Sequence, residues 1–265
     1  MEITAAVNRR MLEVCGVEQE IFEAGTGAPV LFLHPGRGLG GSQPFIEALA
    51  QRARVVAPSH PGFGKTSLPR WMNTVEDLAY YYLDLMDALD LRDVTLVGSS
   101  FGGWIAAALA IKPTSRITRL ALLDPVGAKF GGRDDRDIVD IWAQKRADLD
   151  AMMFHDPAKG RIDYASLPDD ALLALARNRE SEALFGWSPY MHDPKLIHRL
   201  HRVSAPTLVL WGASDRIVTP DYGRAFTAAI PGARFQLISE AGHFPHIEQP
   251  ETCARLVGDL IGQGR

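Results

Sequence analysis

Cysteine is scarce in this sequence, long apolar runs are missing, and basic residues are not in excess. Cys15 and Cys253 are the only cysteines among 265 residues, and their sequence contexts are unrelated, so we expect neither a disulfide framework nor a cysteine-based metal site. No apolar stretch approaches the roughly 18 residues that a membrane-spanning helix needs. Residues 1–10 lack the basic and apolar regions of a secretory signal, so we expect a soluble cytoplasmic protein.

The composition is that of a globular protein with a slightly acidic charge. Lysine and arginine number 28 against 32 aspartates and glutamates, which gives a formal net charge of −4. A protein that binds duplex nucleic acid usually carries a basic domain or stripe, and this chain has neither. Apolar residues make up 46% of the chain, which excludes low-complexity disorder. We therefore expect a small-molecule substrate, with no nucleic-acid or membrane partner.

Short apolar runs that end in glycine-rich turns recur along the chain. Such runs are typical of strands that are buried on both faces of a parallel sheet. They predict strands at residues 30–33, 54–57, 94–97, 117–123, 207–211 and 234–238. Residues 11–24 contain no helical pattern and predict one or two antiparallel strands at the edge of the sheet, turned by Gly16.

Helical patterns separate most of these runs and favour an α/β protein. We predict helices at residues 75–89, 104–111, 221–230 and 251–261. Strands that alternate with helices indicate a parallel sheet covered on both faces. The alternation stops between residues 126 and 203, where we predict helices at residues 137–153 and 168–183 and interpret the region as a helical insertion between two strands of one sheet.

Residues 98–102 read Gly-Ser-Ser-Phe-Gly and follow a predicted strand directly. They match the pattern G-x-S-x-G in the context that it requires, a strand, then a sharp turn, then a helix. The turn holds Ser100 in a strained conformation at a helix N-terminus, where the helix dipole favours developing negative charge. The pattern alone is weak evidence, because a glycine-rich turn without catalytic function also fits it.

A nucleophilic serine needs a base, and the base needs a carboxylate that orients it. Asp215 follows the strand predicted at residues 207–211, and His243 follows the last predicted strand. Loops at the carboxyl ends of parallel strands share one rim of the sheet, so Ser100, Asp215 and His243 can meet there.

The order Ser, Asp, His is that of the α/β hydrolases, and the sequence clearly resembles that superfamily over nearly its whole length. The resemblance is to serine esterases and carbon–carbon bond hydrolases with a helical lid. It rests on His34-Pro35-Gly36 and on residues 98–102, 212–215 and 242–246. It implies a mostly parallel eight-stranded sheet flanked by helices, with Ser100 as nucleophile, His243 as base and Asp215 as the third member of the triad.

Other residues compete for some of these functions. Asp124 also ends a predicted strand, and some relatives take the acid of the triad from that position. His246, His198 and His201 are interpreted as surface or packing residues, because no acidic or cysteine partners complete a metal-binding set. We therefore expect no metal.

The tetrahedral intermediate of acyl transfer needs two hydrogen-bond donors aimed at its oxygen. We expect the Phe101 N–H to be one of them. By resemblance the second is the N–H of Gly36, with Arg37 as second choice, while His34 braces the loop. Residues 36–41 also match the dinucleotide pattern G-x-G-x-x-G, but no acid closes the next strand, so no nucleotide or other cofactor is expected.

Several side chains are candidates for the substrate pocket. Arg37 either pairs with a substrate carboxylate or forms a salt bridge at the surface. The same two alternatives apply to Arg177 and Arg179. Aromatic residues near the motifs and in the insertion fit an apolar pocket wall or the insertion's own core. The aromatic candidates are Phe101, Trp104, Phe154, Trp187 and Phe244.

The first functional hypothesis is a serine hydrolase that cleaves a small carboxylic ester or thioester through an acyl-enzyme. The alternative is a carbon–carbon bond hydrolase acting on a dienoate ring-cleavage product, and a slow or non-catalytic small-molecule receptor is a further alternative. Because the predicted triad lies on both sides of the insertion, we predict one core domain of residues 1–125 and 204–265, carrying residues 126–203 as a cap.

Overall fold

The computed structural model describes residues 7–263. Residues 1–6, which include most of the stretch used to argue against a secretory signal, and residues 264–265 lie outside the described residues. The strands are β1 (Asn8–Val14), β2 (Val17–Ala24), β3 (Pro29–Leu33), β4 (Arg54–Pro58), β5 (Val94–Ser99), β6 (Ile117–Leu123), β7 (Thr207–Gly212) and β8 (Arg234–Ile238). The α-helices are α1 (Gln43–Ala50), α2 (Val75–Ala88), α3 (Phe101–Ala110), α4 (Arg146–Met153), α5 (Asp169–Gly186), α6 (Pro220–Ala228), α7 (Pro245–Glu248) and α8 (Pro250–Gly262).

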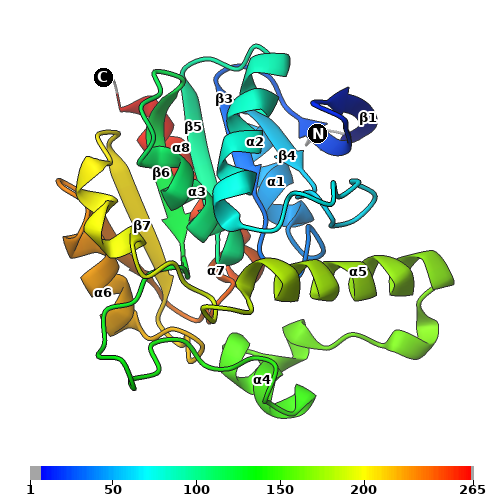
Figure 1. Ribbon diagram of the computed structural model, residues 1–265, viewed down its shortest axis with the longest axis vertical. Coiled ribbons are helices and arrows are strands. Elements are labelled where there is room, and N and C mark those ends of the chain that lie inside the picture. The colour runs from blue at the N-terminus through cyan, green and yellow to red at the C-terminus, as the bar shows by residue number, and fades with distance from the viewer. Residues whose placement is uncertain (1–6, 264–265) are drawn as a thin grey trace.

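The strands form one eight-stranded sheet in the order β1-β2-β4-β3-β5-β6-β7-β8 (Figure 1). β1 pairs with β2, and β2 with β4, in antiparallel register, whereas all other neighbours are parallel. The predicted α/β class, the mostly parallel sheet and the antiparallel edge are thereby confirmed. The direction in which the chain adds strands to the sheet reverses at β3. The next strand, β4, lies on one side of β3, and the strand after that, β5, lies on the other side. Ligands of open α/β sheets bind at such a reversal, beyond the carboxyl ends of the strands.

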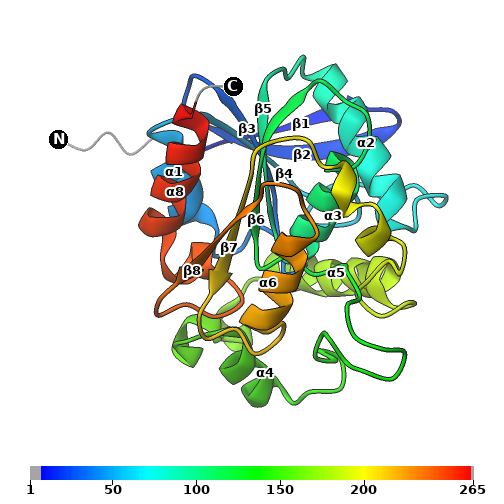
Figure 2. The same cartoon turned by 90° about the vertical axis from the view of Figure 1, so that its left-hand side faces the viewer.

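Helices cover both faces of the sheet (Figure 2). In β3, Val30 and Phe32 belong to the core cluster that contains the buried side chains of α1 and α8, whereas Leu31 and Leu33 belong to the cluster with α2, α3 and α6. This alternation follows from the two-residue period of a strand, and it explains why the β3 run is apolar on both faces. The helix α3 is buried from Phe101 to Leu109, as its nearly continuous apolar sequence predicts.

The inserted segment, residues 126–203, differs from prediction in its first helix. α4 begins at Arg146, not at residue 137. Asp137 accepts hydrogen bonds from the Phe130 and Gly131 N–H groups, and Asp140 accepts one from the Trp142 N–H. Short acidic side chains that bond to nearby backbone in this way stabilise turns at the expense of a helix.

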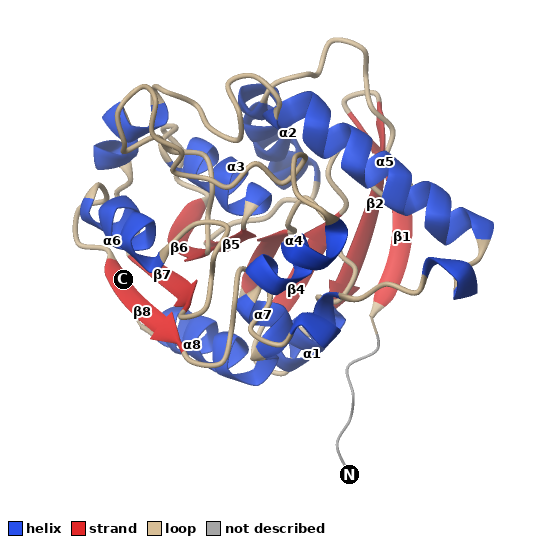
Figure 3. Cartoon of the chain, turned by 90° about the horizontal axis from the view of Figure 1, so that it is seen from below, coloured by secondary structure: helices blue, strands red, loops and turns tan. Residues whose placement is uncertain are grey.

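The second predicted helix of the inserted segment is present as α5. The predicted bounds were residues 168–183, and the helix continues to Gly186. His198 and His201 lie on two successive short 3₁₀-helices, Leu196–His198 and Leu200–Arg202. Seen from below, α4 and α5 lie in front of the sheet (Figure 3), on the side to which the carboxyl ends of the parallel strands point. Among residues 7–263, no helix combines the length and the apolar character that crossing a membrane requires.

Candidate active site

Ser100 forms the turn between β5 and α3. Its backbone has φ 52° and ψ −114°, a left-handed conformation that a serine rarely adopts. A Cβ on Gly98 would overlap the Gly102 carbonyl oxygen, and a Cβ on Gly102 would overlap the carbonyl oxygens of Leu33 and His34. The glycines of the G-x-S-x-G pattern therefore let strand and helix approach closely enough to form this turn.

The three predicted triad side chains form one hydrogen-bonded chain. Ser100 Oγ lies 2.8 Å from His243 Nε2, and His243 Nδ1 lies 2.7 Å from Asp215 Oδ2. With the proton on Nδ1, the imidazole donates to Asp215 and accepts from the Ser100 hydroxyl. The other oxygen of Asp215 accepts from the Ile217 and Val218 N–H groups, which fixes the carboxylate. All three side chains are buried.

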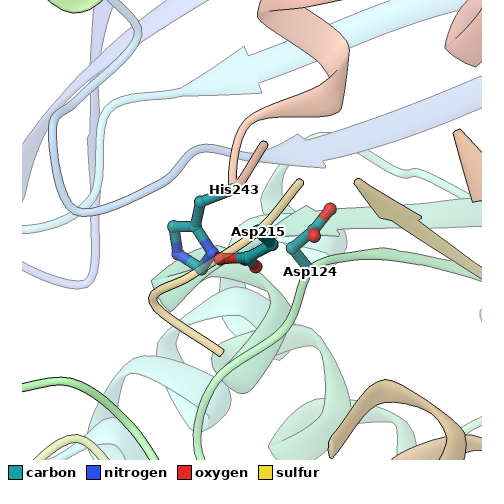
Figure 4. A group of neighbouring side chains, drawn as sticks. All are labelled: Asp124, Asp215 and His243. Atoms are coloured by element: carbon teal, nitrogen blue, oxygen red, sulfur yellow. Dashed lines mark hydrogen bonds and ion pairs between the residues drawn. The ribbon is translucent and has the colours of Figure 1, made fainter. Parts of the chain in front are cut away.

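Asp124 lies beside this chain but not in it. In Figure 4, Asp215 lies between His243 and Asp124. Asp124 Oδ1 accepts a hydrogen bond from the Gly212 N–H at 2.9 Å, and no hydrogen-bond partner is found among the described residues for Oδ2. Burial, and then the neighbouring charge of Asp215, raise the pKa of Asp124 well above its usual value. The geometry therefore favours Asp215 over Asp124 as the partner of His243.

The loop that carries His243 is held by the inserted segment. The His243 N–H donates to the carbonyl oxygen of Met153 at 2.7 Å, and the Gly242 N–H donates to Glu248 at 2.7 Å. The same carboxylate accepts from the N–H groups of His155 and Asp156 at 3.0 Å. The buried Glu248 thus joins the histidine loop to the end of α4, a function that the sequence analysis missed.

The loop after β3 turns beside the nucleophile. The Gly38 N–H donates to the Pro35 carbonyl oxygen at 2.9 Å and closes a turn with Gly36 and Arg37 at its centre. The hydrogen bond of such a turn does not use the two central N–H groups. Phe101 is the first residue of α3, where a helix leaves its N–H groups without intrahelical partners. The Gly36 and Phe101 N–H groups, which are predicted to bind the oxyanion, are therefore not needed for the hydrogen bonds of the turn or of the helix.

A buried polar cluster braces this loop at its base. The His34 ring donates from Nδ1 to the Pro35 carbonyl oxygen at 2.7 Å and accepts from the His60 N–H at 2.9 Å. His60 Nε2 donates to the His34 carbonyl oxygen at 2.8 Å, and the Tyr82 hydroxyl donates to His60 Nδ1. Burial lowers the pKa of His34 to about 4, so both rings remain neutral and keep this pattern. His34 thus contacts the loop as predicted, while His60 and Tyr82 escaped the sequence analysis.

His246, His198 and His201 belong to no close group of metal-ligand atoms among residues 7–263. His246 is fully buried between the rings of Phe32 and Phe45, and His198 and His201 are exposed. Within residues 7–263, the one group of carboxylate and imidazole ligand atoms close enough to hold a metal is Asp124, Asp215 and His243. Hydrogen bonds within the triad and to backbone N–H groups already use most of these atoms.

Arg37 points inward and makes no surface salt bridge. Its guanidinium lies 5.2 Å from the centre of the Phe154 ring and 5.6 Å from that of Phe244, and Nη2 donates to the Gly160 carbonyl oxygen at 3.3 Å. Nη1 is buried and has no partner among the described residues. Arg37 lines two adjoining cavities of about 90 and 470 Å³. The surface alternative is therefore wrong, and an unpaired cationic donor faces the space beside Gly36.

The other pocket candidates separate into two groups. Phe154 lines the larger cavity, and Phe244 packs on Phe154 and on Arg37. Trp104 instead packs in the core against Phe101, and Trp187 is 63% exposed at the end of α5, so the structure does not bring Trp187 to the site. Arg177 bonds to backbone carbonyl oxygens of Gly64 and Thr66. Arg179 lies at the rim of the smaller cavity, where its guanidinium is 5.1 Å from the centre of the Trp142 ring.

Comparison with known proteins gives the family. Residues 30–256 match the model of the Alpha/beta hydrolase family. The 2-hydroxy-6-oxo-2,4-heptadienoate hydrolase of Pseudomonas putida is 27% identical, with 95% of each chain aligned. The 2-hydroxy-6-oxo-6-phenylhexa-2,4-dienoate hydrolase of Rhodococcus sp. superposes with a TM-score of 0.78 at 22% identity, over 98% of this chain and 100% of that one. A membrane phospholipase A superposes with a TM-score of 0.77 at 23% identity, over 97% and 87%.

The solved structures share the fold, and their differing names show that this fold alone does not decide the substrate. The family model, in contrast, covers most of the chain and includes the elements that carry Ser100, Asp215 and His243. The hydrolase predicted from the motifs is therefore confirmed at the level of the family: this chain belongs to the α/β hydrolase family.

Proposed function

We propose that this chain is a serine hydrolase whose nucleophile is Ser100. The observation that carries the proposal is the buried hydrogen-bonded chain Ser100–His243–Asp215, with distances of 2.8 and 2.7 Å. His243 takes the proton of Ser100 as its Oγ attacks a carbonyl carbon, and the N–H groups of Phe101 and Gly36 hold the resulting oxyanion. After the first product leaves, His243 activates a water molecule that releases the acyl group from Ser100.

For the substrate, we infer a carbon–carbon bond hydrolase of the 2-hydroxy-6-oxo-dienoate class. Relatives that align over nearly the whole chain carry such names, and the unpaired Nη1 of Arg37 supplies a cationic donor beside the oxyanion loop. The 2-hydroxydienoate first tautomerises to its 2,6-dioxo form, which moves the proton of the 2-hydroxyl group to C5. When Ser100 then attacks C6 and the C5–C6 bond breaks, the electron pair left on C5 spreads through the C3–C4 double bond to the 2-oxo group, which takes up the proton that His243 removed from Ser100. Arg37 would hold the carboxylate next to that group. This reverses the order of the sequence analysis, which placed ester and thioester hydrolysis first.

The proposal includes the division of the chain. Residues 1–125 and 204–265 form the catalytic core, and the inserted segment is a cap that closes the site. Support comes from α5, because Asn178 bonds to the Arg37 carbonyl oxygen at 3.0 Å and Ser181 bonds to the Gly62 carbonyl oxygen at 2.8 Å. The cap thereby contacts the loops after β3 and β4 on the side of the sheet where Ser100 lies.

Turnover of two substrate classes tests the proposal. Purified protein is assayed with 2-hydroxy-6-oxo-6-phenylhexa-2,4-dienoate, p-nitrophenyl acetate and a short acyl thioester, with the Ser100→Ala variant as background. We expect kcat/KM for the dienoate to exceed that for the aryl ester by at least about 100-fold, which is about 2.7 kcal/mol of transition-state binding. A higher kcat/KM for the aryl ester than for the dienoate would support ester hydrolysis as the function instead. If no substrate is turned over and no phosphonate labels Ser100, the receptor alternative stands and the hydrolase proposal is wrong.

Loss of the Arg37 charge should weaken binding of the acidic dienoate and leave binding of the neutral aryl ester almost unchanged. We expect Arg37→Met to raise KM for the dienoate about 10- to 100-fold, because a charge-assisted hydrogen bond contributes roughly 1.5–3 kcal/mol. KM for the neutral aryl ester should stay within about threefold. Arg37→Lys, which keeps a point charge, should lose less than Arg37→Met.

Steady-state kinetics on both substrates check this prediction. Arg92→Met serves as the control, because Arg92 is exposed and pairs with Asp90 outside the site. An unchanged KM for the dienoate in Arg37→Met would show that Arg37 does not bind the substrate carboxylate.

A further inference from the structure

A carboxyl group of the cap faces the loop after β3. Glu182 on α5 lies against Gly36 so closely that a Cβ on that glycine would overlap the carboxyl group. Both residues line the smaller cavity, of about 90 Å³, together with Arg37. The carboxyl group therefore lies beside the N–H proposed to hold the oxyanion.

The surrounding contacts fix the position of Glu182. Asn178, Ser181, Glu182 and Phe185 follow the i, i+3, i+4, i+7 spacing of one helix face. Asn178 and Ser181 bond to core loops, with Asn178 Oδ1 accepting from the Gly64 N–H at 2.9 Å, and the Phe185 ring lies 6.2 Å from that of Phe101. Because residues on both sides are attached to the core, the half-buried Glu182 side chain is held at the smaller cavity, beside Gly36.

The carboxyl group has no hydrogen-bond or ion-pair partner among the described residues. The titratable and charged side chains that face it or share its cavity are Arg37, Arg146, Tyr164, Arg179, Tyr190 and His243. Burial raises the pKa of Glu182 to about 7, against the opposing attraction of His243, Arg179 and Arg37. The acid is therefore neutral over part of the physiological pH range.

We propose that protonated Glu182 is a catalytic residue that donates a third hydrogen bond to the oxyanion formed when Ser100 attacks the substrate. The proton stays on Glu182, so no bond to it forms or breaks. A neutral carboxylic acid is a donor, whereas an ionised one beside Gly36 would repel the oxyanion. This inference rests on the proposed function. It adds that the cap helix completes the oxyanion hole and makes the reaction dependent on pH.

The test measures how pH affects the reaction of Ser100. Hydrolysis of p-nitrophenyl acetate and labelling by a fluorophosphonate are both followed from pH 5 to pH 9. We expect the wild-type rates to fall with an apparent pKa near 7, as Glu182 ionises. Glu182→Gln, a donor that does not ionise, should keep its rate above pH 7, and Glu182→Leu should lose about tenfold or more at pH 6. Glu180→Gln is the matched control, because Glu180 is exposed on the same helix and should follow the wild-type profile.

The outcomes separate this inference from the proposed function. If wild type labels no better than Ser100→Ala, the hydrolase itself is refuted and the inference fails with it. If wild type labels but shares its pH profile with Glu182→Gln, or if Glu182→Leu keeps the full rate at pH 6, only the inference fails.

Thermal unfolding gives a second readout that needs no turnover. An acid whose pKa is raised on folding binds more protons in the folded state, so its ionisation lowers stability as pH rises from the ordinary pKa toward the raised one. Between pH 5 and pH 8 the melting temperature of Glu182→Gln should therefore rise relative to that of wild type. If the difference in melting temperature between Glu182→Gln and wild type stays constant from pH 5 to pH 8, Glu182 is not an acid whose pKa is raised on folding. The inference, which depends on a neutral Glu182, then fails.

Discussion

Replacing Asp215 with asparagine should lower kcat about 10⁴-fold, whereas the same change at Asp124 should cost less than about tenfold. Asp215 Oδ2 accepts a hydrogen bond from His243 Nδ1–H at 2.7 Å. An asparagine there presents either an NH₂ group, which cannot accept this hydrogen bond, or an oxygen without the charge that stabilises the imidazolium. In the first case His243 takes the wrong tautomer and can no longer accept the proton of Ser100.

Asp124 responds differently because its carboxyl group lies outside the hydrogen-bonded chain of Ser100, His243 and Asp215. Burial raises the pKa of Asp124, and Oδ1 accepts the Gly212 N–H at 2.9 Å. Asparagine keeps this carbonyl acceptor and removes only a charge that the buried site disfavours. The check is kcat for both variants on the best substrate, with near-ultraviolet circular dichroism to confirm that each is folded. A larger loss for Asp124→Asn than for Asp215→Asn would assign the acid of the triad to Asp124, the alternative raised by the sequence.

Much of the fold and of the candidate site could be predicted, because the candidate catalytic side chains directly follow the ends of strands. The runs at β3, β5 and β7 are apolar on both faces, so their limits and their parallel pairing follow from local sequence. Once the strands are parallel, their carboxyl ends share a rim, and Ser100, Asp215 and His243 can be brought together without knowledge of side-chain packing. The glycines beside Ser100 add a steric requirement that few other turns have.

The side chains that the inserted segment contributes could not be placed in this way. The core-facing side of α5 carries Asn178, Ser181 and Glu182, which bond to backbone or line a cavity. Its sequence therefore lacks the apolar stripe that indicates which face of a helix is buried. Arg37 was ambiguous for a similar reason, because an arginine in a glycine-rich loop is usually exposed, and only the rings of Phe154 and Phe244 reveal its orientation.

Gly102→Ala should destabilise the protein by at least about 3 kcal/mol or prevent folding, because overpacking against backbone cannot be relieved by a change of rotamer. The added Cβ would overlap the carbonyl oxygens of Leu33 and His34 where α3 meets the end of β3. Relief requires α3 to move away from β3. Such a movement would carry Phe101 and Ser100 away from the loop that contains Gly36, so any folded fraction should also lose activity.

Urea unfolding monitored by tryptophan fluorescence measures this loss. Gly262→Ala is the matched control: Gly262 lies in the last turn of α8, and a Cβ there would meet nothing within 4 Å. We expect this control to be neutral or stabilising by up to about 1 kcal/mol, since alanine favours a helix over glycine. The contrary result is a Gly102→Ala protein that is active and unfolds with a free energy within about 1 kcal/mol of that of wild type. That result would mean that β3 and α3 need not approach each other this closely. The positions of Ser100 and the oxyanion donors would then not depend on the glycine.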